Sequence, residues 1–211
     1  MAKKRAKKPR VLVINNESRY MADLRRTVNN HAKGKAEVDT AHVSEAKSKL
    51  KDMPEAVILS GSHKRRYDNP EVQAIIEHID TYNKENPDSQ VQVYGACLGH
   101  QALVHYHGGK IEDLGRYQKG NKEIELKDGR KVKVHKHHRH GVTDAGGLEV
   151  IAESTVQDAQ GKGVRIVEAV KHKSKPYTAS QGHPEREGHA QDMLYDFLNS
   201  VYKKKRHKMA V

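Results

Sequence analysis

The residues of this chain best suited to chemistry are one cysteine and a histidine–acid pair far downstream of it. Cys97 is the only cysteine among 211 residues and lies in the motif Gly-Ala-Cys-Leu-Gly. His183 and Glu185 lie in Gln-Gly-His-Pro-Glu. A thiolate is a nucleophile, an imidazole can take and return a proton, and a carboxylate can orient the imidazole. The three residues therefore predict a Cys-His-Glu triad for acyl transfer.

The neighbours of Cys97 predict the turn that would present it. An apolar run at residues 91–94 precedes the motif, and a helix-like run at residues 101–106 follows it. Small residues on both sides suit a tight strand-to-helix turn, because bulky side chains would clash there. A lone cysteine is more often a buried apolar residue than a nucleophile. The prediction therefore depends on the flanking glycines together with the distant His-Pro-Glu.

The two motifs together resemble those of the class I glutamine amidotransferases. Their glutaminase domains carry Gly-x-Cys-x-Gly-x-Gln and, near the C-terminal end, His-Pro-Glu. Here Gly95, Cys97, Gly99 and Gln101 match the first motif, and residues 183–185 match the second. Within the family, the glutaminase subunit of archaeal-type GMP synthase is the most similar in appearance, since it shares Cys-Leu-Gly-His-Gln.

The resemblance implies an activity and a set of site residues. It implies hydrolysis of glutamine to glutamate and ammonia by Cys97, His183 and Glu185, with the ammonia passed to a partner synthetase of the GMP synthase kind. No cofactor and no metal are implied. The residues it assigns to the oxyanion hole and the glutamine pocket are Gly61, Ser62, Leu98, Gln101, Tyr117 and His138. A stand-alone hydrolase of γ-glutamyl compounds is a further alternative.

The loop after the strand at residues 57–60 departs from the family pattern. Relatives carry Ser-Gly-Gly-Pro there, whereas this chain has Ser-Gly-Ser-His followed by Lys64-Arg65-Arg66. If the backbone needs a positive φ at Ser62, a residue with a Cβ is strained. We therefore expect an effect of this loop on activity more than on the fold.

A histidine-rich segment at residues 135–140 is the second departure, since relatives carry Ser-His-x-Asp there. His138 aligns with the family histidine, and His140 replaces the acid. On a strand, His135 and His137 would share one face. A metal site is disfavoured, because no cysteine or acid joins the cluster and interleaved Lys and Arg would repel a cation.

The net charge of +12 is concentrated at the two ends of the chain. Eleven of the 39 Lys and Arg residues lie in residues 1–10 and 203–211, which contain no acid, leaving 28 against 27 acids between them. Basic ends on a near-neutral body predict contact with nucleic-acid phosphates, although solubilising ends are the alternative. The candidate nucleic-acid contacts are Lys3, Lys4, Arg5, Lys7, Lys8, Arg10, Lys64, Arg65, Arg66, Lys203, Lys204, Lys205 and Arg206. The alternative function is thus an amidotransferase-fold protein recruited to RNA or a ribonucleoprotein, such as the ribosome, with weak or no glutaminase activity.

Periodicity predicts the elements that position these residues. Strands are expected at 11–15, 37–43, 57–60, 91–94, 122–126, 130–135, 148–153, 163–171 and 177–181, and helices at 18–31, 44–51, 70–83, 101–106 and 191–203. Ser44 and Asn69 are expected to cap the second and third of these helices, and Asp128-Gly129 predicts a hairpin turn. Alternating strands and helices favour an α/β fold, a three-layer α/β/α sandwich with a mainly parallel sheet. The resemblance implies the flavodoxin-like class I amidotransferase fold. We expect a basic N-terminal arm (1–10), one domain (11–202) and a basic C-terminal tail (203–211).

Cysteine usage and hydropathy predict the compartment. A single cysteine excludes an internal disulfide, which suits a reducing cytoplasm. No apolar run is long enough to span a membrane, and the basic start of the chain is not followed by the apolar segment of a secretory signal.

Overall fold

A computed structural model describes residues 7–186 and 191–208. Its elements are β1 (Arg10–Asn15), α1 (Met21–Ala32), β2 (Glu37–His42), α2 (Val43–Lys49), β3 (Ala56–Leu59), α3 (Pro70–Glu85), β4 (Gln92–Ala96), α4 (Leu98–Tyr106), β5 (Lys110–Glu125), β6 (Lys131–Asp144), β7 (Glu149–Gln157), β8 (Gly163–Lys171), β9 (Tyr177–Ser180) and α5 (Gln191–Lys208). Every predicted strand and helix is present, most with ends shifted by a few residues.

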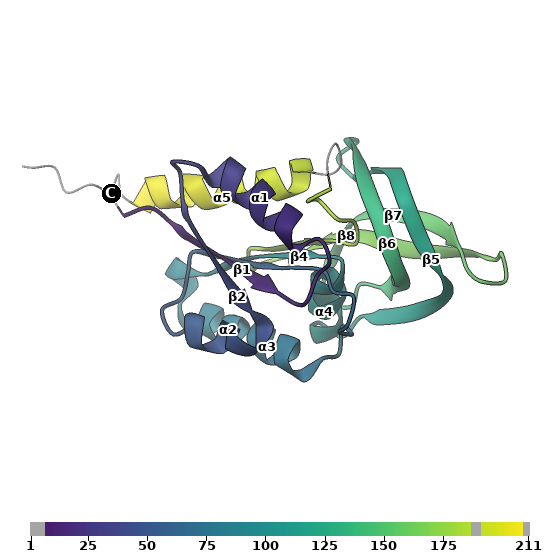
Figure 1. Cartoon of the computed structure of the whole chain (residues 1–211), viewed down its shortest axis with the longest axis horizontal. Coiled ribbons are helices and arrows are strands. Elements are labelled where there is room, and N and C mark those ends of the chain that lie inside the picture. The colour runs from purple at the N-terminus through teal and green to yellow at the C-terminus, as the bar shows by residue number, and fades with distance from the viewer. Residues whose placement is uncertain (1–6, 187–190, 209–211) are drawn as a thin grey trace, which may run out of the picture.

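The main sheet has seven strands in the order β2-β1-β3-β4-β9-β8-β7. The first five are parallel, and β8 and β7 extend the sheet in antiparallel fashion. The parallel part has the flavodoxin-like order, in which the chain changes direction across the sheet between β1 and β3. Helices α1 and α5 cover one face, and α2 and α3 cover the other (Figure 1). The predicted α/β/α sandwich with a mainly parallel sheet is confirmed.

Each face of the sheet buries its own apolar core. Leu12, Val57 and Val93 point to the face with α2, α3 and α4, whereas Val13, Ile58 and Tyr94 point to the face with α1 and α5. Alternate side chains of a strand point to opposite faces, so strands covered on both sides are apolar throughout. This is why β1, β3 and β4 are recognisable from the sequence.

Helix caps were predicted correctly in one case and wrongly in another. The Asn69 side chain accepts hydrogen bonds from the N–H groups of Glu71 and Val72 at the start of α3, as predicted. Ser44 does not cap α2. The helix begins one residue earlier, and the His42 ring accepts a hydrogen bond from the N–H of Ser44.

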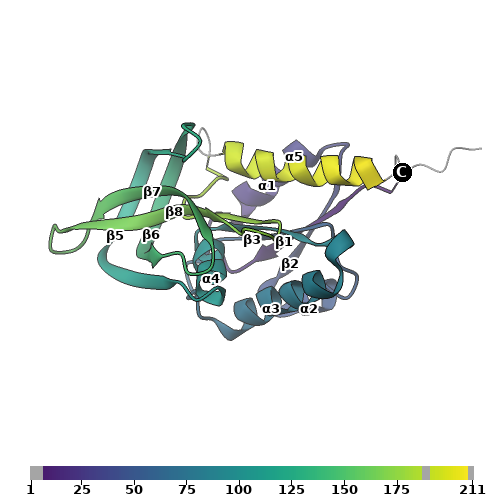
Figure 2. The ribbon, with the colours of Figure 1, turned by 180° about the vertical axis from the view of Figure 1, so that it is seen from behind.

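Strands β5 and β6 form a separate two-stranded antiparallel sheet that projects beside the main sheet (Figures 1 and 2). The predicted turn at Gly129 is present, with φ of 83°. Both strands are far longer than predicted, and β6 includes the histidine-rich segment. Most of β5 is exposed and polar, so it lacks the apolar alternation that identifies a strand from sequence.

The described ends of the chain lie together, at the end of the molecule opposite the β5–β6 hairpin (Figure 1). Arg10 belongs to β1, where its guanidinium donates to the carbonyl of Asp52, and α5 continues to Lys208, five residues beyond the predicted helix. Lys3, Lys4 and Arg5 lie outside the described residues, as do the side chains of Lys205 and Arg206. Within the described residues, no helix has the length and apolarity needed to cross a bilayer.

Candidate active site

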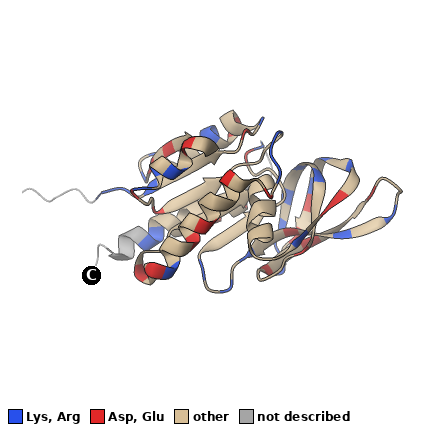
Figure 3. Cartoon of the chain, turned by 90° about the horizontal axis from the view of Figure 1, so that it is seen from below, with Lys and Arg blue, Asp and Glu red and all other residues tan. Residues whose placement is uncertain are grey.

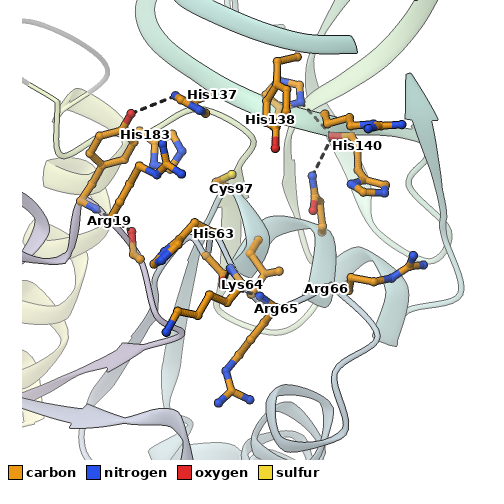
Figure 4. Close-up of a pocket in the computed structure, with 17 residues that line it drawn as sticks. Arg19, His63, Lys64, Arg65, Arg66, Cys97, His137, His138, His140 and His183 are labelled. Carbon is orange, nitrogen blue, oxygen red and sulfur yellow. Dashed lines mark hydrogen bonds between the residues drawn. The ribbon is translucent and has the colours of Figure 1, made fainter. Parts of the chain in front are cut away.

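A cavity of about 240 Å³ opens where the loops after β1 and β3 meet the start of α4. Ligands of parallel α/β sheets bind in this place, beyond the carboxyl ends of the strands at the change of direction. In Figure 4, Cys97 lies between the loop carrying His63 and Lys64 and the strand carrying His137 and His138. The lining residues are Ser18, Arg19, Tyr20, Ser62, His63, Lys64, Arg65, Arg66, Cys97, Leu98, Gln101, Tyr117, His137, His138, Arg139, His140 and His183.

Cys97 occupies a strained turn between β4 and α4. Its φ is 50° and its ψ is −100°, a conformation that residues with a Cβ rarely adopt. Its N–H donates to the carbonyl of Ser180 at 2.9 Å, which fixes the turn against β9. A Cβ on Gly95 would lie 2.6 Å from the backbone of Gly99, and a Cβ on Gly99 would lie 2.4 Å from the carbonyl oxygen of Leu59. The glycines of the motif are therefore required by close backbone approach.

The tertiary structure brings His183 to the same cavity as Cys97, and Glu185 contacts the His183 ring from outside the cavity lining. His183 Nδ1 lies 2.9 Å from Glu185 Oε1, and both side chains are almost fully buried. A carboxylate only accepts hydrogen bonds, so Nδ1 carries the proton and Nε2 is left for the thiol. A Cβ placed on Gly61 would lie 2.9 Å from His183 Cε1 and 3.4 Å from Cys97 Cβ, so both side chains pack against this glycine.

The electrostatics of His183 favour its protonated form. Burial alone would lower the pKa of this imidazole. The charges of Cys97 and Glu185, together with hydrogen bonds to both, outweigh burial and hold the pKa of His183 well above its ordinary value of 6.5. A protonated imidazole beside a cysteine is the pairing that nucleophilic cysteines use.

The predicted oxyanion residues flank Cys97. Leu98 is the first residue of α4, so its N–H has no acceptor within the helix. Gly61 and Ser62 lie in the loop after β3, beside the cysteine and the histidine. Among the described residues only Glu17 and Cys97 are non-glycine residues with positive φ. The serine at position 62 is therefore free of the backbone strain considered from the sequence.

The predicted pocket residues Gln101, Tyr117 and His138 all line the cavity. Gln101 Nε2 donates to the carbonyl of His140 at 2.9 Å and to Gln181 Oε1 at 3.1 Å, which leaves its own carbonyl oxygen to accept. His138 Nδ1 donates to the carbonyl of His140, and burial lowers its pKa to about 3. Tyr117 is 54% exposed at the entrance.

Two residues near the reactive groups were missed from the sequence. The Tyr20 ring lies edge to face against His183, with centroids 4.8 Å apart, and its hydroxyl lies 3.1 Å from His137 Nδ1. Gln181 Nε2 lies 3.7 Å from Cys97 Sγ. Gln181 stands two residues before His183, a proximity that could have identified it. No local signal marks Tyr20, because it reaches the site from the loop after β1.

The histidine-rich strand β6 alternates as predicted, with His135 and His137 on the more open face and Lys136 and His138 buried. Lys136 forms a buried ion pair with Glu168 of β8, and Ser154 binds the same carboxylate. Among residues 7–186 and 191–208, no group of three or more His, Cys, Asp or Glu side chains is arranged to hold a metal ion.

The candidate nucleic-acid residues fall into two separate regions. Lys64, Arg65 and Arg66 line the cavity. Lys7 and Lys8 are exposed just before β1, and Lys203 and Lys204 lie in the last turns of α5, at the other end of the sheet. Over the helices between them, acidic and basic residues are interspersed (Figure 3).

Comparisons with known proteins agree with this architecture. The family described as "Glutamine amidotransferase class-I" matches residues 12–201. The glutamine-hydrolysing GMP synthase subunit of Thermococcus kodakarensis is 28% identical over 191 residues, which are 83% of this chain and 88% of that protein. The corresponding subunit of Methanothermobacter thermautotrophicus is 26% identical over 206 residues, 90% of this chain and 98% of that protein.

A solved structure from Thermoplasma acidophilum, described as a candidate GMP synthase subunit, has a TM-score of 0.68 with 96% of each chain covered and 15% identity, a likeness of fold. Because the family match spans nearly the whole described structure, the chain belongs to the class I glutamine amidotransferase family.

Proposed function

We propose that this chain is a glutaminase subunit that hydrolyses glutamine through Cys97, His183 and Glu185 and passes ammonia to a separate synthetase. Residues 11–202 are its amidotransferase domain. The observation that carries the proposal is a cysteine on a strained turn, packed with His183 against Gly61, while Glu185 holds the far side of the imidazole.

The chemistry follows from these positions. The Cys97 thiolate attacks the side-chain carbonyl carbon of glutamine, and the N–H of Leu98 and one from the Gly61–Ser62 loop stabilise the oxyanion. The His183 imidazolium then protonates the departing nitrogen, which leaves as ammonia. Water, deprotonated by the neutral His183, opens the thioester and releases glutamate.

The acceptor we propose is a synthetase of the GMP synthase kind. This rests on the relatives named as subunits of glutamine-hydrolysing GMP synthase, whose lengths this chain spans almost completely. The glutaminase would need its synthetase for full rate, so the decisive measurements are made with and without a candidate synthetase.

Covalent trapping of Cys97 tests the mechanism without a partner. A diazoketone analogue of glutamine should add once to the wild-type chain and not to Cys97→Ala, as measured by intact mass. Glutamate release in the presence of the synthetase should disappear in the same variant. Glutamate release that survives in Cys97→Ala would refute the mechanism.

Recruitment to RNA is a second candidate function. It is supported by the exposed Lys7 and Lys8 next to β1 and by the excess of basic residues at both ends of the chain. Removal of residues 1–8, which carry five Lys and Arg residues, combined with Lys203→Ser/Lys204→Ser, should weaken RNA binding and reduce its dependence on salt. RNA binding that ignores salt would count against this role.

A further inference from the structure

The entrance of the Cys97 cavity is lined by cations without any acid. Four exposed side chains, Arg19, Lys64, Arg66 and Arg139, form what we term the cationic rim. No Asp or Glu is among the residues that line the cavity in the described structure. Any ligand at this entrance therefore faces positive charge before it reaches the sulfur.

The acids that pair with the rim are not part of the cavity lining. Lys64 is 3.6 Å from Glu17, Arg66 Nε is 3.4 Å from Asp68, and Arg139 Nε is 2.7 Å from Asp113. None of these carboxylates lines the cavity. Arg19 has no carboxylate within 4 Å in the part of the chain that the structure describes. Three of the four cations are thus held by carboxylates that do not themselves line the cavity.

The same positive charges help to lower the pKa values of two neighbouring histidines. Burial lowers the pKa of His137, and the charges of Arg19 and Lys119 lower it further. Burial also lowers the pKa of His140, with Arg66 and Arg139 adding to the effect against the opposing charge of Asp113.

An exposed aromatic ring stands beside these cations. Tyr117 is the one large apolar side chain that is exposed among the described residues, and Lys119 Nζ lies 5.2 Å from its ring centroid. Tyr67, next to the rim, has the Arg66 guanidinium 5.3 Å from its centroid. Rings paired with cations are how proteins bind single-stranded nucleic acid, since bases stack on the ring and phosphates meet the charge.

We propose that the cationic rim binds single-stranded RNA and that the bound strand closes the entrance to Cys97. Phosphates contact Arg19, Lys64, Arg66 and Arg139, and a base stacks on Tyr117. Three of the four cations are arginines, whose planar forks suit phosphate. An acidic polypeptide would use the charge but leave the exposed ring without a stacking partner.

The consequence is mutual exclusion between RNA and glutamine. The RNA site itself is independent of the proposed glutaminase function, and only this consequence rests on it. The rim lies at the carboxyl edge of the parallel strands, whereas the described ends of the chain, at β1 and α5, lie at the opposite edge (Figure 1). The rim is therefore a separate site that can be tested apart from the arms.

Binding is tested on the full chain carrying Cys97→Ala, with a fluorescein-labelled single-stranded RNA of about 15 nucleotides. The rim variant is Arg19→Ser/Lys64→Ser/Arg66→Ser, and the matched control removes equal charge at the opposite edge through Lys33→Ser/Lys51→Ser/Lys173→Ser. Fluorescence anisotropy should show binding at least about tenfold weaker in the rim variant, with the slope of log affinity against log salt reduced by about 2. Tyr117→Ser should weaken binding at least about fivefold. Equal losses in the rim and control variants would overturn the proposal.

Occlusion is tested on the chain with Cys97 intact, where the single cysteine makes alkylation by iodoacetamide specific. Saturating RNA should slow alkylation at least about tenfold in the wild type and the control variant, and not in the rim variant. If RNA binds but the rate of Cys97 alkylation is unchanged, occlusion is refuted. If polyaspartate protects Cys97 equally well, the ligand of the rim is an acidic polypeptide and not RNA. If Cys97 resists alkylation without RNA, the glutaminase proposal fails, while the anisotropy comparison still decides the rim.

Discussion

Replacing Gly61 by alanine tests whether its close packing against His183 matters for the chemistry. The added Cβ would lie 2.9 Å from His183 Cε1, whereas ordinary contacts begin near 3.4 Å. The imidazole must therefore move by about 0.5 Å or more. Because Cε1 lies between the two ring nitrogens, this shift disturbs both the hydrogen bond to Glu185 and the approach to Cys97.

The expected loss of rate is large and the expected loss of stability is small. A misplacement of about 1 Å can cost roughly a hundredfold in rate, so a shift of half that distance should cost roughly tenfold. The φ of Gly61 is not in the left-handed region, so alanine is compatible with the backbone. The free energy of unfolding should change by less than about 1 kcal/mol.

The assay pairs two rates with a fold control. Glutamate release with the synthetase and alkylation of Cys97 at neutral pH should both fall, while urea unfolding stays near that of the wild type. Gly163→Ala is the matched control, since its Cβ meets only the Thr155 methyl group at 3.3 Å. A folded Gly61→Ala chain with both rates unchanged would refute the geometric reasoning.

Three other predictions concern buried ionisable side chains. Glu185→Gln removes the charge that helps keep the triad imidazole protonated, so alkylation of the cysteine at neutral pH should fall by roughly tenfold or more; an unchanged rate would remove Glu185 from the mechanism. Lys136→Met leaves Glu168 buried without its ion pair and should lower the free energy of unfolding in urea by about 3–5 kcal/mol, whereas Lys131→Met, in an exposed pair of the same strand, should cost less than about 1 kcal/mol. Burial lowers the pKa of His100 to about 4, below its unfolded value of 6.5, so its contribution to stability is complete above pH 6.5 and is lost as the pH falls toward 4. His100→Gln should flatten that acid decline in urea unfolding, and an unaltered slope would show that other groups cause it.

The contrast between β4 and β5 shows what kind of strand a sequence reveals. β4 is buried on both faces and apolar, so its position and the turn after it were predicted closely. β5 is polar and exposed along most of its length and is paired only with β6, so only its end near the turn was predicted. Packing against a core requires apolar side chains at regular positions, which can be recognised in the sequence. Backbone hydrogen bonding between exposed strands places no such requirement on the side chains.

The prediction that Ser44 caps α2 was wrong for a related reason. Ser44 has the side chain of a good cap, but His42 occupies that position because β2 runs directly into the helix. Tertiary connection between the two elements outweighed local preference.

The parallel sheet and the turn at Cys97 could be predicted from the sequence by itself, because they depend on apolar periodicity and on local backbone demands. His183 and Glu185 were predicted as partners of Cys97 from a motif that resembles the amidotransferase family. Only the tertiary structure decided that Tyr20 packs on His183 and that Arg19, Lys64 and Arg139 surround one opening. These residues come from loops and strands far apart in the chain. Contacts between such distant segments depend on the order of the strands in the sheet, and no local sequence pattern records that order.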